Sequence, residues 1–600
     1  MGENLDGLRT LYTKWGKKVD RECPLPEHPR PQLMRGHWQN LNGVWEYAIL
    51  DGVPGRIPDR FDGEIVVPFS PESALSGVGR MLEPGQTLWY SKKVPFDAVD
   101  KERVLLHFGA VDQCCTVYCN GNTVGTHEGG YWPFSLDITE FLKDGANLIQ
   151  LAVTDESDGG LQAYGKQRME RGGIWYTPQS GIWQTVWAEY VPEVYIRDLK
   201  ITPRYDEGCV DFTLFFQDHL PPSEVLVEIF DGDTAVVREK FQSNRFRVAV
   251  PEFKSWSPES PFLYRVILTV GEDCVESYFG MRKFGIAVDE KGCPRLALNG
   301  RPVFHNGLLD QGYFSDGLYT APSDEAIVEE LSRVKALGFN MLRKHIKIEP
   351  MRWYYHCDRL GLFVWQDFVS GGGPFDIWAV RNLPFLGVEV KDNRYKMLGR
   401  RDPLGRRIFE KNMRDTVKAL YNVVSLAVWV PFNEGWGQFD AVRITQALHK
   451  LDPTRLIDHA SGWYDQGAGD IRSYHVYNKR FRMKKDPCGR IQALTEFGGY
   501  SWPCRKHMVS RRLFGYRILK SREELTKAYE KLYREAVLAN VELGLSAAVY
   551  TQVSDVEDEI NGLFTYDRAV LKVNKETVRG INREIQEMFE KVTAAVPDTL

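Results

Sequence analysis

Two stretches of the chain place carboxylates where a buried strand is expected to end. Residues 426–430, LAVWV, form a short apolar run, and Pro431, Asn433 and Glu434 follow at once. Residues 491–497, IQALTEF, form another such run and carry Glu496 near their end. A protonated carboxyl can donate to a departing oxygen while an ionised carboxylate attacks the carbon that it leaves. The pair predicts this chemistry if both strands end at one edge.

The composition is that of a multidomain globular chain. Its 600 residues, 43% hydrophobic and 26% charged, are too many for one hydrophobic core. The net charge of −5 argues against a nucleic-acid partner or an anionic membrane surface. The cysteines show neither metal-ligand nor disulfide spacing, and no apolar run is long enough to span a membrane. Because no signal peptide is visible, we predict a cytoplasmic protein. Because no metal-binding or cofactor-binding motif is present, we predict that it requires no metal or other cofactor.

The pattern of proline, apolar and turn residues changes three times along the chain, which predicts four units. Residues 1–30 are rich in proline and read as an arm on the surface. Residues 31–192 and 193–286 show short β-type runs separated by turn residues, which predict a jelly-roll β-sandwich and an immunoglobulin-like β-sandwich. Residues 287–600 alternate strands with helices, the pattern of a (β/α)₈ TIM barrel.

The barrel prediction brings the two glutamates together. Its strands are expected at 303–308, 340–345, 362–368, 426–434, 456–463, 471–477, 491–497 and 546–553. Active sites of such barrels lie at the carboxyl ends of the strands. Glu434 ends the fourth strand and Glu496 the seventh, so both project into one mouth. Two carboxylates so placed suit double displacement at a sugar, with one as acid/base and the other as nucleophile.

Several motifs resemble those of glycoside hydrolase family 2, which includes β-galactosidases, β-glucuronidases and β-mannosidases. They are HEGGYWPFSLDIT (127–139), YTPQSGIWQTVWAE (176–189), NGRPVFHNGL (299–308), WVPFNEGWGQ (429–438) and LTEFGG (494–499), in the family's order. The resemblance implies that Asn433 and Glu434 are the family's Asn-Glu pair with Glu434 as acid/base, and that Glu496 is the nucleophile. It further implies that His345 contacts sugar hydroxyls and that Tyr477 hydrogen-bonds the nucleophile.

Other side chains are candidates for binding the sugar. Asp310 and Asp367 end the first and third strands and could grip hydroxyls, with loop capping as the alternative. Trp436, Trp463 and Tyr550 could stack on a sugar ring. We interpret His475 as structural, because we expect it to point away from the neighbours of Glu496.

The sequence departs from the family pattern at positions that bear on which sugar is bound. Val423 stands where many members have a histidine, and Tyr550 where many have a tryptophan. Asn561 is followed by glycine and leucine, so the Asn-x-Lys with which bacterial β-glucuronidases hold a carboxylate is absent. A terminal β-D-galactoside is therefore our first expectation, with an α-L-arabinoside still open.

A uronide is the runner-up, because a basic cluster on the second strand could bind a carboxylate instead. The cluster consists of Arg343, Lys344 and Lys347. A carbohydrate-binding protein without catalysis is the remote alternative. We expect residues 155–175 to reach over the mouth and impose exo action, and the large sandwiches favour a homo-oligomer.

Overall fold

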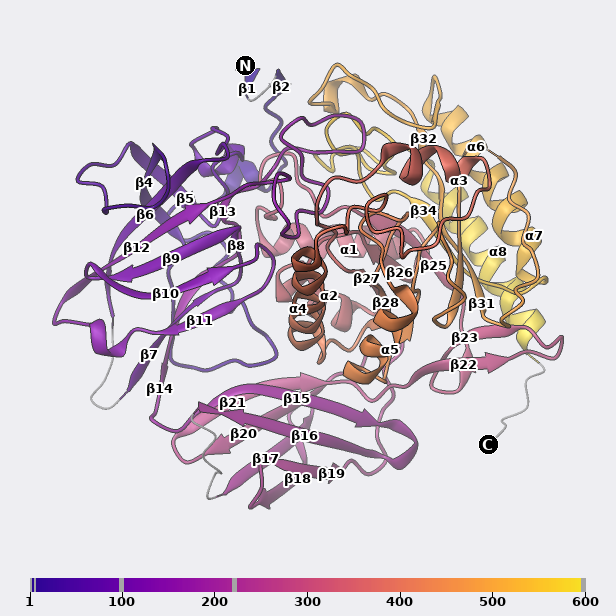
Figure 1. Ribbon diagram of the computed structural model, residues 1–600. Coiled ribbons are helices and arrows are strands. Elements are labelled where there is room, and N and C mark those ends of the chain that lie inside the picture. The colour runs from indigo at the N-terminus through magenta and orange to yellow at the C-terminus, as the bar shows by residue number, and fades with distance from the viewer. Residues whose placement is uncertain (1–2, 5–6, 97–101, 218–223, 478, 595–600) are drawn as a thin grey trace.

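The computed structural model describes residues 3–4, 7–96, 102–217, 224–477 and 479–594. The chain forms two β-sandwiches and an α/β barrel that lie against one another (Figure 1). The fold class predicted from the sequence is confirmed.

The first sandwich packs a six-stranded sheet on a four-stranded sheet. The order of the larger sheet is β10 (Asn122–Glu128), β9 (Cys114–Cys119), β12 (Ala146–Thr154), β6 (Gln86–Pro95), β4 (Gly43–Asp51) and β5 (Gly63–Val67). The order of the smaller is β11 (Phe134–Asp137), β7 (Arg103–Phe108), β14 (Val186–Val191) and β3 (Trp38–Asn40). Strands form because apolar residues alternate: β9 buries Cys115, Val117 and Cys119 and turns the residues between them outward.

The second sandwich is smaller and lies below the other two units in Figure 1. One sheet has the order β15 (Ile196–Arg204), β16 (Cys209–Phe216) and β19 (Arg245–Ala249). The other has the order β18 (Thr234–Phe241), β17 (Val225–Asp231), β20 (Tyr264–Val270) and β21 (Asp273–Phe279). A small sheet of β22 (Phe284–Val288), β23 (Pro294–Leu298) and β24 (Arg301–Pro302) follows. The boundary that we predicted between residues 286 and 287 falls inside β22.

The barrel contains eight parallel strands, which follow the eight expected from the sequence. Their order is β29 (Leu456–Ile457), β28 (Leu426–Val430), β27 (Phe363–Asp367), β26 (Met341–Lys344), β25 (His305–Asp310), β34 (Leu545–Thr551), β31 (Ile491–Gly498) and β30 (Ile471–Val476). Every residue of β28 is buried, because helices cover the outside and side chains fill the inside. This is why β28 reads as a continuous apolar run.

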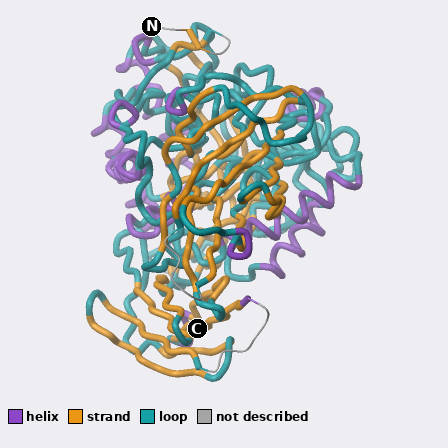
Figure 2. The backbone as a smooth tube through the Cα atoms, turned by 90° about the vertical axis from the view of Figure 1, so that its left-hand side faces the viewer, coloured by secondary structure: helices purple, strands orange, loops and turns teal. Residues whose placement is uncertain are grey.

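Helices surround the barrel, and Figure 2, in which the first sandwich faces the viewer, shows helices on both sides of the central strands. They are α1 (Asp324–Ala336), α2 (Met351–Leu360), α3 (Leu383–Phe385), α4 (Pro403–Leu420), α5 (Ala441–Leu451), α6 (Arg522–Tyr533), α7 (Ala539–Val541) and α8 (Lys575–Thr593). The side chain of Ser323 caps α1 by accepting from the backbone N–H of Ala326 at 3.2 Å. Among the described residues, no helix is both long and apolar enough to cross a membrane.

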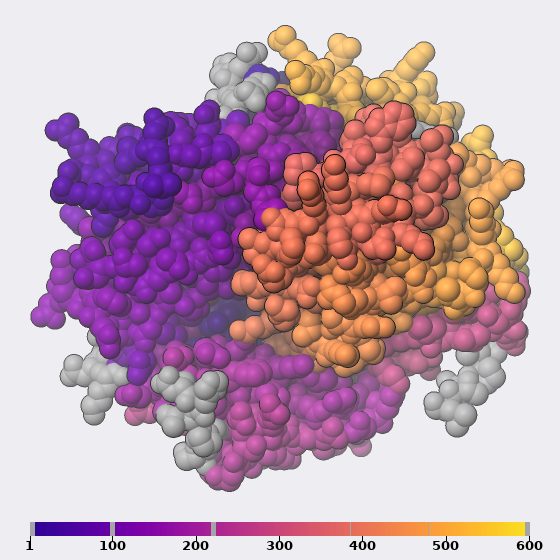
Figure 3. All heavy atoms as spheres, viewed as in Figure 1, coloured from indigo at the N-terminus to yellow at the C-terminus, as the bar shows by residue number. Residues whose placement is uncertain are grey.

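The segment before the first sandwich is more than a surface arm. Trp15 is buried, and the backbone N–H and hydroxyl of Thr13 both donate to Asp316 at 2.7 Å. The expectation of an arm that only runs over the surface is therefore wrong for these residues. The first sandwich and the barrel also press together over the face seen in Figure 3, so segments of the sandwich can reach the mouth of the barrel.

Candidate active site

The backbone after β28 turns Glu434 into the mouth of the barrel. Beyond Pro431, Asn433 pairs with Ser461, and the N–H of Glu434 donates to the carbonyl of Ser461 at 2.9 Å. Glu434 has a φ of 51°, in the left-handed region that non-glycine residues seldom adopt. Such strained backbone persists where surrounding contacts hold it, and it is enriched at functional sites.

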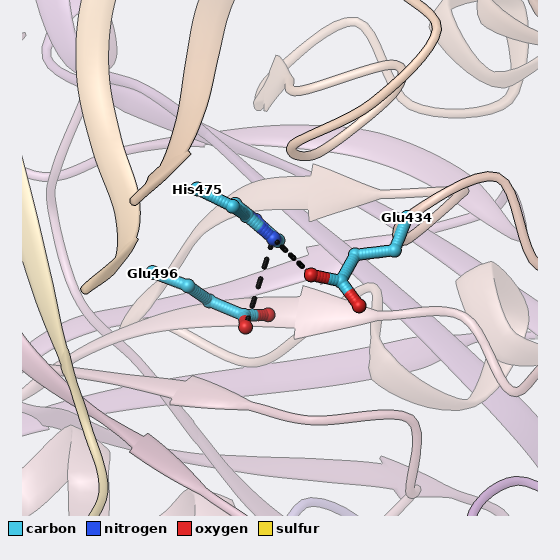
Figure 4. Close-up of side chains that lie close together, drawn as sticks. All are labelled: Glu434, His475 and Glu496. Carbon is cyan, nitrogen blue, oxygen red and sulfur yellow. Dashed lines mark hydrogen bonds and ion pairs between the residues drawn. The ribbon is translucent and has the colours of Figure 1, made fainter. Parts of the chain in front are cut away.

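Glu434 and Glu496 meet in the mouth, as the strand count predicted. An oxygen of each carboxyl and Nδ1 of His475 all lie within 4.8 Å of one another. Figure 4 shows the imidazole pointing toward both carboxyl groups, with Glu434 and Glu496 reaching in from opposite sides.

Glu496 is held by two strong donors. The hydroxyl of Tyr477 donates to Oε2 at 2.5 Å, and Nη1 of Arg343 donates to Oε1 at 3.2 Å. Tyr477 also lies 2.9 Å from Oγ1 of Thr551, which fixes the phenol. Both contacts place a hydrogen-bond donor against the carboxyl group of Glu496, and the contact with Arg343 also brings a positive charge close to it.

At Glu434, the effect of burial outweighs that of the nearby positive charges. Burial raises the pKa of its carboxyl to about 7, although the charges of Lys166 and Arg343 act against that rise. The group therefore carries its proton through the acidic and near-neutral range. The two carboxyl groups are differentiated by their surroundings, as general acid and nucleophile must be.

His475 corrects one of our expectations. Its Nδ1 lies 2.8 Å from Oε1 of Glu434 and 3.6 Å from Oε2 of Glu496. Burial lowers the pKa of the imidazole to about 4, so the ring is neutral. Residues two apart on a strand share a face, so His475 points inward with Tyr477. The expectation that His475 points away from the glutamates is therefore wrong, while its interpretation as a structural residue stays a prediction.

Arg343 organises the floor of the mouth. Its five N–H donors go to two oxygens of Asp367 at 2.9 and 3.1 Å, Asn433 Oδ1 at 2.8 Å, Glu496 at 3.2 Å and the carbonyl of Thr495 at 3.1 Å. Asp367 also faces Nδ1 of His345 at 2.8 Å. The structure thus brings Asn433, His345 and Asp367 together beside the glutamates. Arg343 has no donor left for a substrate carboxylate.

Lys344 and Asp310 lie on the wrong face for the predicted contacts with substrate. Nζ of Lys344 bonds Asp310 at 2.6 Å and Glu349 at 2.7 Å, and it sits 4.2 Å from the ring of Trp353 on α2. Adjacent residues of a strand point oppositely, so Arg343 faces the mouth and Lys344 faces the helices. Asp310 also accepts from the N–H of Gly312 at 2.9 Å, which is the loop-capping alternative.

Lys347 is not available to a substrate either. Its Nζ bonds Glu349 at 2.9 Å and the carbonyls of Gly312 and Tyr319 at 2.6 and 2.8 Å. Arg343 and Lys344 are also engaged, so each cation of the basic cluster is paired with acidic or carbonyl groups of the protein itself. The expectation that it receives a uronic acid is therefore wrong.

Tyr550 is another correction. Its ring packs against Phe497 of β31 and against Tyr529 and Tyr533 of α6, and it is fully buried. The next residue, Thr551, is the one that reaches Tyr477 in the mouth. Strand alternation therefore sends Tyr550 to the outer layer, where it cannot stack on a sugar.

The aromatic wall of the mouth combines expected and unexpected rings. The ring of Trp463 lies 5.6 Å from that of His475, and the ring of Trp436 lies 5.0 Å from that of Trp175. Tyr516 stacks on Tyr477 at 3.8 Å. Our sequence analysis did not single out Trp175 or Tyr516. Its one relevant signal was the expectation that residues 155–175 approach the mouth.

The same loop brings Lys166 to the site. The first sandwich supplies this residue, and its ammonium lies 4.7 Å from the ring of Trp436 and 5.6 Å from that of Trp175. Burial lowers the pKa of its ammonium group, and the carboxyl groups of Glu559, Glu496 and Glu434 act against that fall. Lys166 was also missed, because nothing local in its sequence distinguishes it from a surface lysine.

The grouping of Glu434, His475 and Glu496 is compact enough to hold a cation. Two carboxylates and an imidazole are ordinary ligands for Zn²⁺. The atoms that would bind the metal are, however, those that the acid and nucleophile roles require. The absence of a required metal stays a prediction.

Comparison with family models identifies both sandwiches. Residues 80–186 match the sugar binding domain of glycosyl hydrolases family 2, and residues 194–282 match a second domain of glycosyl hydrolases family 2. Both sandwiches are thus similar to domains of glycoside hydrolase family 2, and the motif at residues 127–139 lies inside the first match. The resemblance to this family that we predicted from the sequence is confirmed.

Curated relatives of this family include several named β-galactosidase. That of Pseudoalteromonas haloplanktis is 26% identical and the match covers 61% of this chain and 34% of the relative. That of Photobacterium profundum is 24% identical, with 72% and 43% covered. A putative β-glucuronidase of Formosa agariphila is 26% identical, with 66% and 49% covered. The matches thus span between about a third and half of the length of these relatives.

Solved structures of the family share the fold over nearly the whole chain. A β-glucuronidase from an uncultured Clostridium sp. superposes with a TM-score of 0.70 at 17% identity, covering 93% of this chain and 99% of that one. A β-D-glucuronidase of Dictyoglomus thermophilum gives 0.71 at 17% identity, with 95% and 99% covered. A family 2 β-galacturonidase of Eisenbergiella tayi bound to galacturonate gives 0.68 at 18% identity, with 92% and 99% covered.

Proposed function

We propose that the protein is a retaining glycosidase that removes one terminal β-linked sugar by double displacement. The observation that carries this proposal is the approach of the Glu434 and Glu496 carboxyl oxygens to within 4.8 Å. Retaining glycosidases need two carboxyl groups about 5 Å apart, whereas inverting enzymes separate theirs by about 6.5–9.5 Å to admit water. The similarity to glycoside hydrolase family 2 supports the same reading.

Each carboxyl group has a role that follows from its surroundings. Glu496, gripped by Tyr477 and Arg343, attacks the anomeric carbon and forms a glycosyl-enzyme ester. Glu434 donates its proton to the leaving oxygen, which departs with the aglycone. Glu434, now ionised, takes a proton from a water that attacks the same carbon and frees Glu496. The configuration at the anomeric carbon is retained after two inversions.

Residues 155–175 supply the basis for exo action. Backbone N–H groups of Tyr164 and Gly165 donate to the carbonyl of Ser370 at 3.0 Å, which ties this loop to the barrel. Nη1 of Arg171 lies 3.1 Å from Asp558, in the segment after β34. We infer that a loop anchored at both sides closes one end of the mouth and so restricts the enzyme to a terminal sugar. Release of internal fragments from an oligosaccharide would contradict exo action.

A galacto-configured sugar is our first candidate, because several of the curated relatives are named β-galactosidase. An α-L-arabinopyranoside has the same ring stereochemistry without the CH₂OH group and stays open. A β-glucuronide or β-galacturonide is the second candidate. Arg343, Lys344 and Lys347 are paired within the protein, so they no longer support binding of a uronide carboxylate. Lys166 is another cation that could bind it. A cytoplasmic location and a homo-oligomer also remain proposals.

Replacement of Glu496 by Gln is the direct test. The amide keeps the size of the side chain but cannot form the glycosyl ester, so turnover of chromogenic β-glycosides should fall by a factor on the order of 10⁴ or more. The Glu496→Gln protein should still unfold near the temperature of the wild type. In Glu496→Ala, where the shorter side chain leaves room for an external anion, added azide should restore turnover and give the α-glycosyl azide.

Three outcomes would count against the proposal. Full activity of Glu496→Gln would remove its nucleophile. A product of inverted configuration from the wild-type enzyme, observed by NMR during early turnover, would rule out double displacement. A folded protein that binds sugars but hydrolyses no glycoside would favour the non-catalytic alternative.

A further inference from the structure

Lys166 is a buried cation without an ionic partner. It is 6% exposed, and within the described part of the chain no carboxylate lies within 4 Å of its ammonium nitrogen. Its ammonium nitrogen lies over the ring faces of Trp436 and Trp175. Indole faces stabilise a cation but accept no conventional hydrogen bond, so they replace lost hydration only in part.

The carboxylates around Lys166 are each engaged elsewhere. Glu559 accepts from the hydroxyl of Tyr176 and, at 2.8 Å, from Nδ2 of Asn561. Asp367 is held by Arg343, and Glu496 by Tyr477. Oε1 of Glu434 lies 2.8 Å from Nδ1 of His475. The hydrogens of the ammonium group are thus left for an acceptor that the described part of the protein does not supply.

The position of Lys166 is fixed by its own backbone. The carbonyl of Lys166 accepts from the N–H of Tyr176 at 3.0 Å, and Gln167 pairs with Tyr176 in a short bridge. Gly165, just before it, is tied to Ser370 of the barrel. A side chain held on such a frame loses little further freedom on binding, which favours recognition of a specific group.

Two cations act on Glu434, namely Lys166 and Arg343. All five donors of Arg343 are used within the protein. Lys166 is therefore the cation beside the acid that can reach a ligand. Its charge, its desolvated setting and its free donors match an anionic oxygen better than a neutral hydroxyl, because only an anion also offsets the buried charge.

We propose that Lys166 binds the carboxylate of a terminal uronic acid, so that the preferred substrate is a β-linked uronide. This inference rests on the proposed function and refines its sugar. A β-galacturonide has the galacto configuration of the first candidate and also carries a carboxylate where galactose has CH₂OH. The site differs from the Asn-x-Lys pattern in coming from the first sandwich and not from the segment after β34.

The test compares sugars that differ only at this position. Rates are measured on 4-nitrophenyl β-D-galacturonide and β-D-galactoside, and on the glucuronide and glucoside as a second pair. The wild type should prefer the uronide of at least one pair. Lys166→Met should lower kcat/KM on that uronide by about 100-fold and reduce the uronide-to-neutral ratio at least tenfold. Lys166→Arg, which keeps the charge, should recover part of the ratio.

Arg168→Met is the matched control. Arg168 lies in the same loop, with its guanidinium 4.5 Å from the ring of Trp175, but it is paired with Asp158 at 2.7 Å. Its removal should leave the uronide-to-neutral ratio unchanged. Unfolding temperatures of the variants show whether each has folded.

Several outcomes would overturn the inference. An equal loss on uronide and neutral substrate in Lys166→Met would mean that the ammonium only balances the charge of the carboxylates. A wild type that prefers both neutral sugars would also refute it.

Failure of the proposed function would give a different result from failure of the Lys166 inference. The folded wild type would then hydrolyse none of these substrates. Lys166 would still be testable through calorimetric binding of D-galacturonic acid and D-galactose. Binding of the acid that depends on Lys166 would support the inference without catalysis, and absence of such binding would end it.

Discussion

At the scale of single residues, chemically identical side chains acquire different roles from their neighbours. Glu434 and Glu496 are both buried carboxyl groups, yet burial dominates at Glu434 and raises its pKa to about 7. Glu496 receives donors from a phenol and a guanidinium. The proposed division into acid and nucleophile thus rests on two sets of contacts and not on residue type.

The pKa of Glu434 predicts the alkaline side of the pH profile. Below pH 7 the acid is protonated and competent, and above pH 7 its proton is lost, so kcat/KM should fall by about tenfold per pH unit at high pH. The measurement is kcat/KM from about pH 5 to about pH 10. In Glu434→Gln this limb should disappear. A limb that lies above about pH 9, or that survives in Glu434→Gln, would show that another group is responsible.

His475 is predicted to position the acid. Its contact with Glu434 at 2.8 Å needs a proton between the two atoms, and this proton links the acid to the floor of the mouth. His475→Phe should lower kcat/KM on an alkyl glycoside by a factor on the order of 100, because misplaced catalytic groups lose rate steeply.

The leaving group separates positioning from general damage. A 2,4-dinitrophenyl glycoside needs little acid assistance, so its rate should fall much less in His475→Phe than that of an alkyl glycoside. The pH limb assigned to Glu434 should shift as well. Equal losses on both substrates, with an unchanged limb, would assign His475 a purely structural role.

At the scale of elements, we propose that the loop of residues 155–175 closes one end of the mouth. Gly165 lies where this loop meets the barrel, with a φ of +64°. A Cβ there would come within 2.8 Å of the carbonyl of Ile346, which is backbone and cannot move aside cheaply. Glycine is required at this point both for its conformation and for the close approach.

Gly165→Ala should therefore lift the loop and displace Lys166. We expect kcat/KM to fall by a factor on the order of 100, since displacement of a binding group by about 1 Å has this effect. The control is Gly160→Ala in the same loop, where the nearest atom to the new Cβ would be 3.7 Å away. Full activity of folded Gly165→Ala would show that the loop does not shape the site.

At the scale of the whole molecule, one arginine joins the two sandwiches. Nε of Arg35 donates to Asp273 of β21 at 2.7 Å, and Nη1 donates to Glu189 of β14 at 2.7 Å. Glu189 is fully buried, and Arg30 also contacts it at 2.9 Å. A buried charge network of this kind fixes the relative position of the domains that supply its members.

Arg35→Met should loosen this junction. Removing one partner from a buried ion pair leaves uncompensated charge and typically costs about 3–5 kcal/mol. We expect an earlier first transition in urea unfolding, followed by circular dichroism. Arg56→Met is the control, because the Arg56–Asp59 pair has side chains 85% and 81% exposed and should contribute nothing measurable. Coincident unfolding curves for Arg35→Met and wild type would contradict the prediction.

The sequence by itself determined the barrel, its eight strands and the meeting of Glu434 with Glu496. Each strand has a local signature of apolar runs and turn residues, and the parallel order places all carboxyl ends at one mouth. A residue at a strand end can therefore be located without knowledge of its distant contacts. The helix cap at Ser323 was predictable for the same local reason.

Only the tertiary structure decided which faces and which remote segments complete the site. Lys344, Asp310 and Tyr550 lie at strand ends but point to the outer layer, because a change of one position reverses the direction of a side chain. Lys166 and Trp175 reach the mouth only because the first sandwich packs on the barrel. Such contacts join segments hundreds of residues apart and depend on packing between domains, for which the local sequence carries no signal.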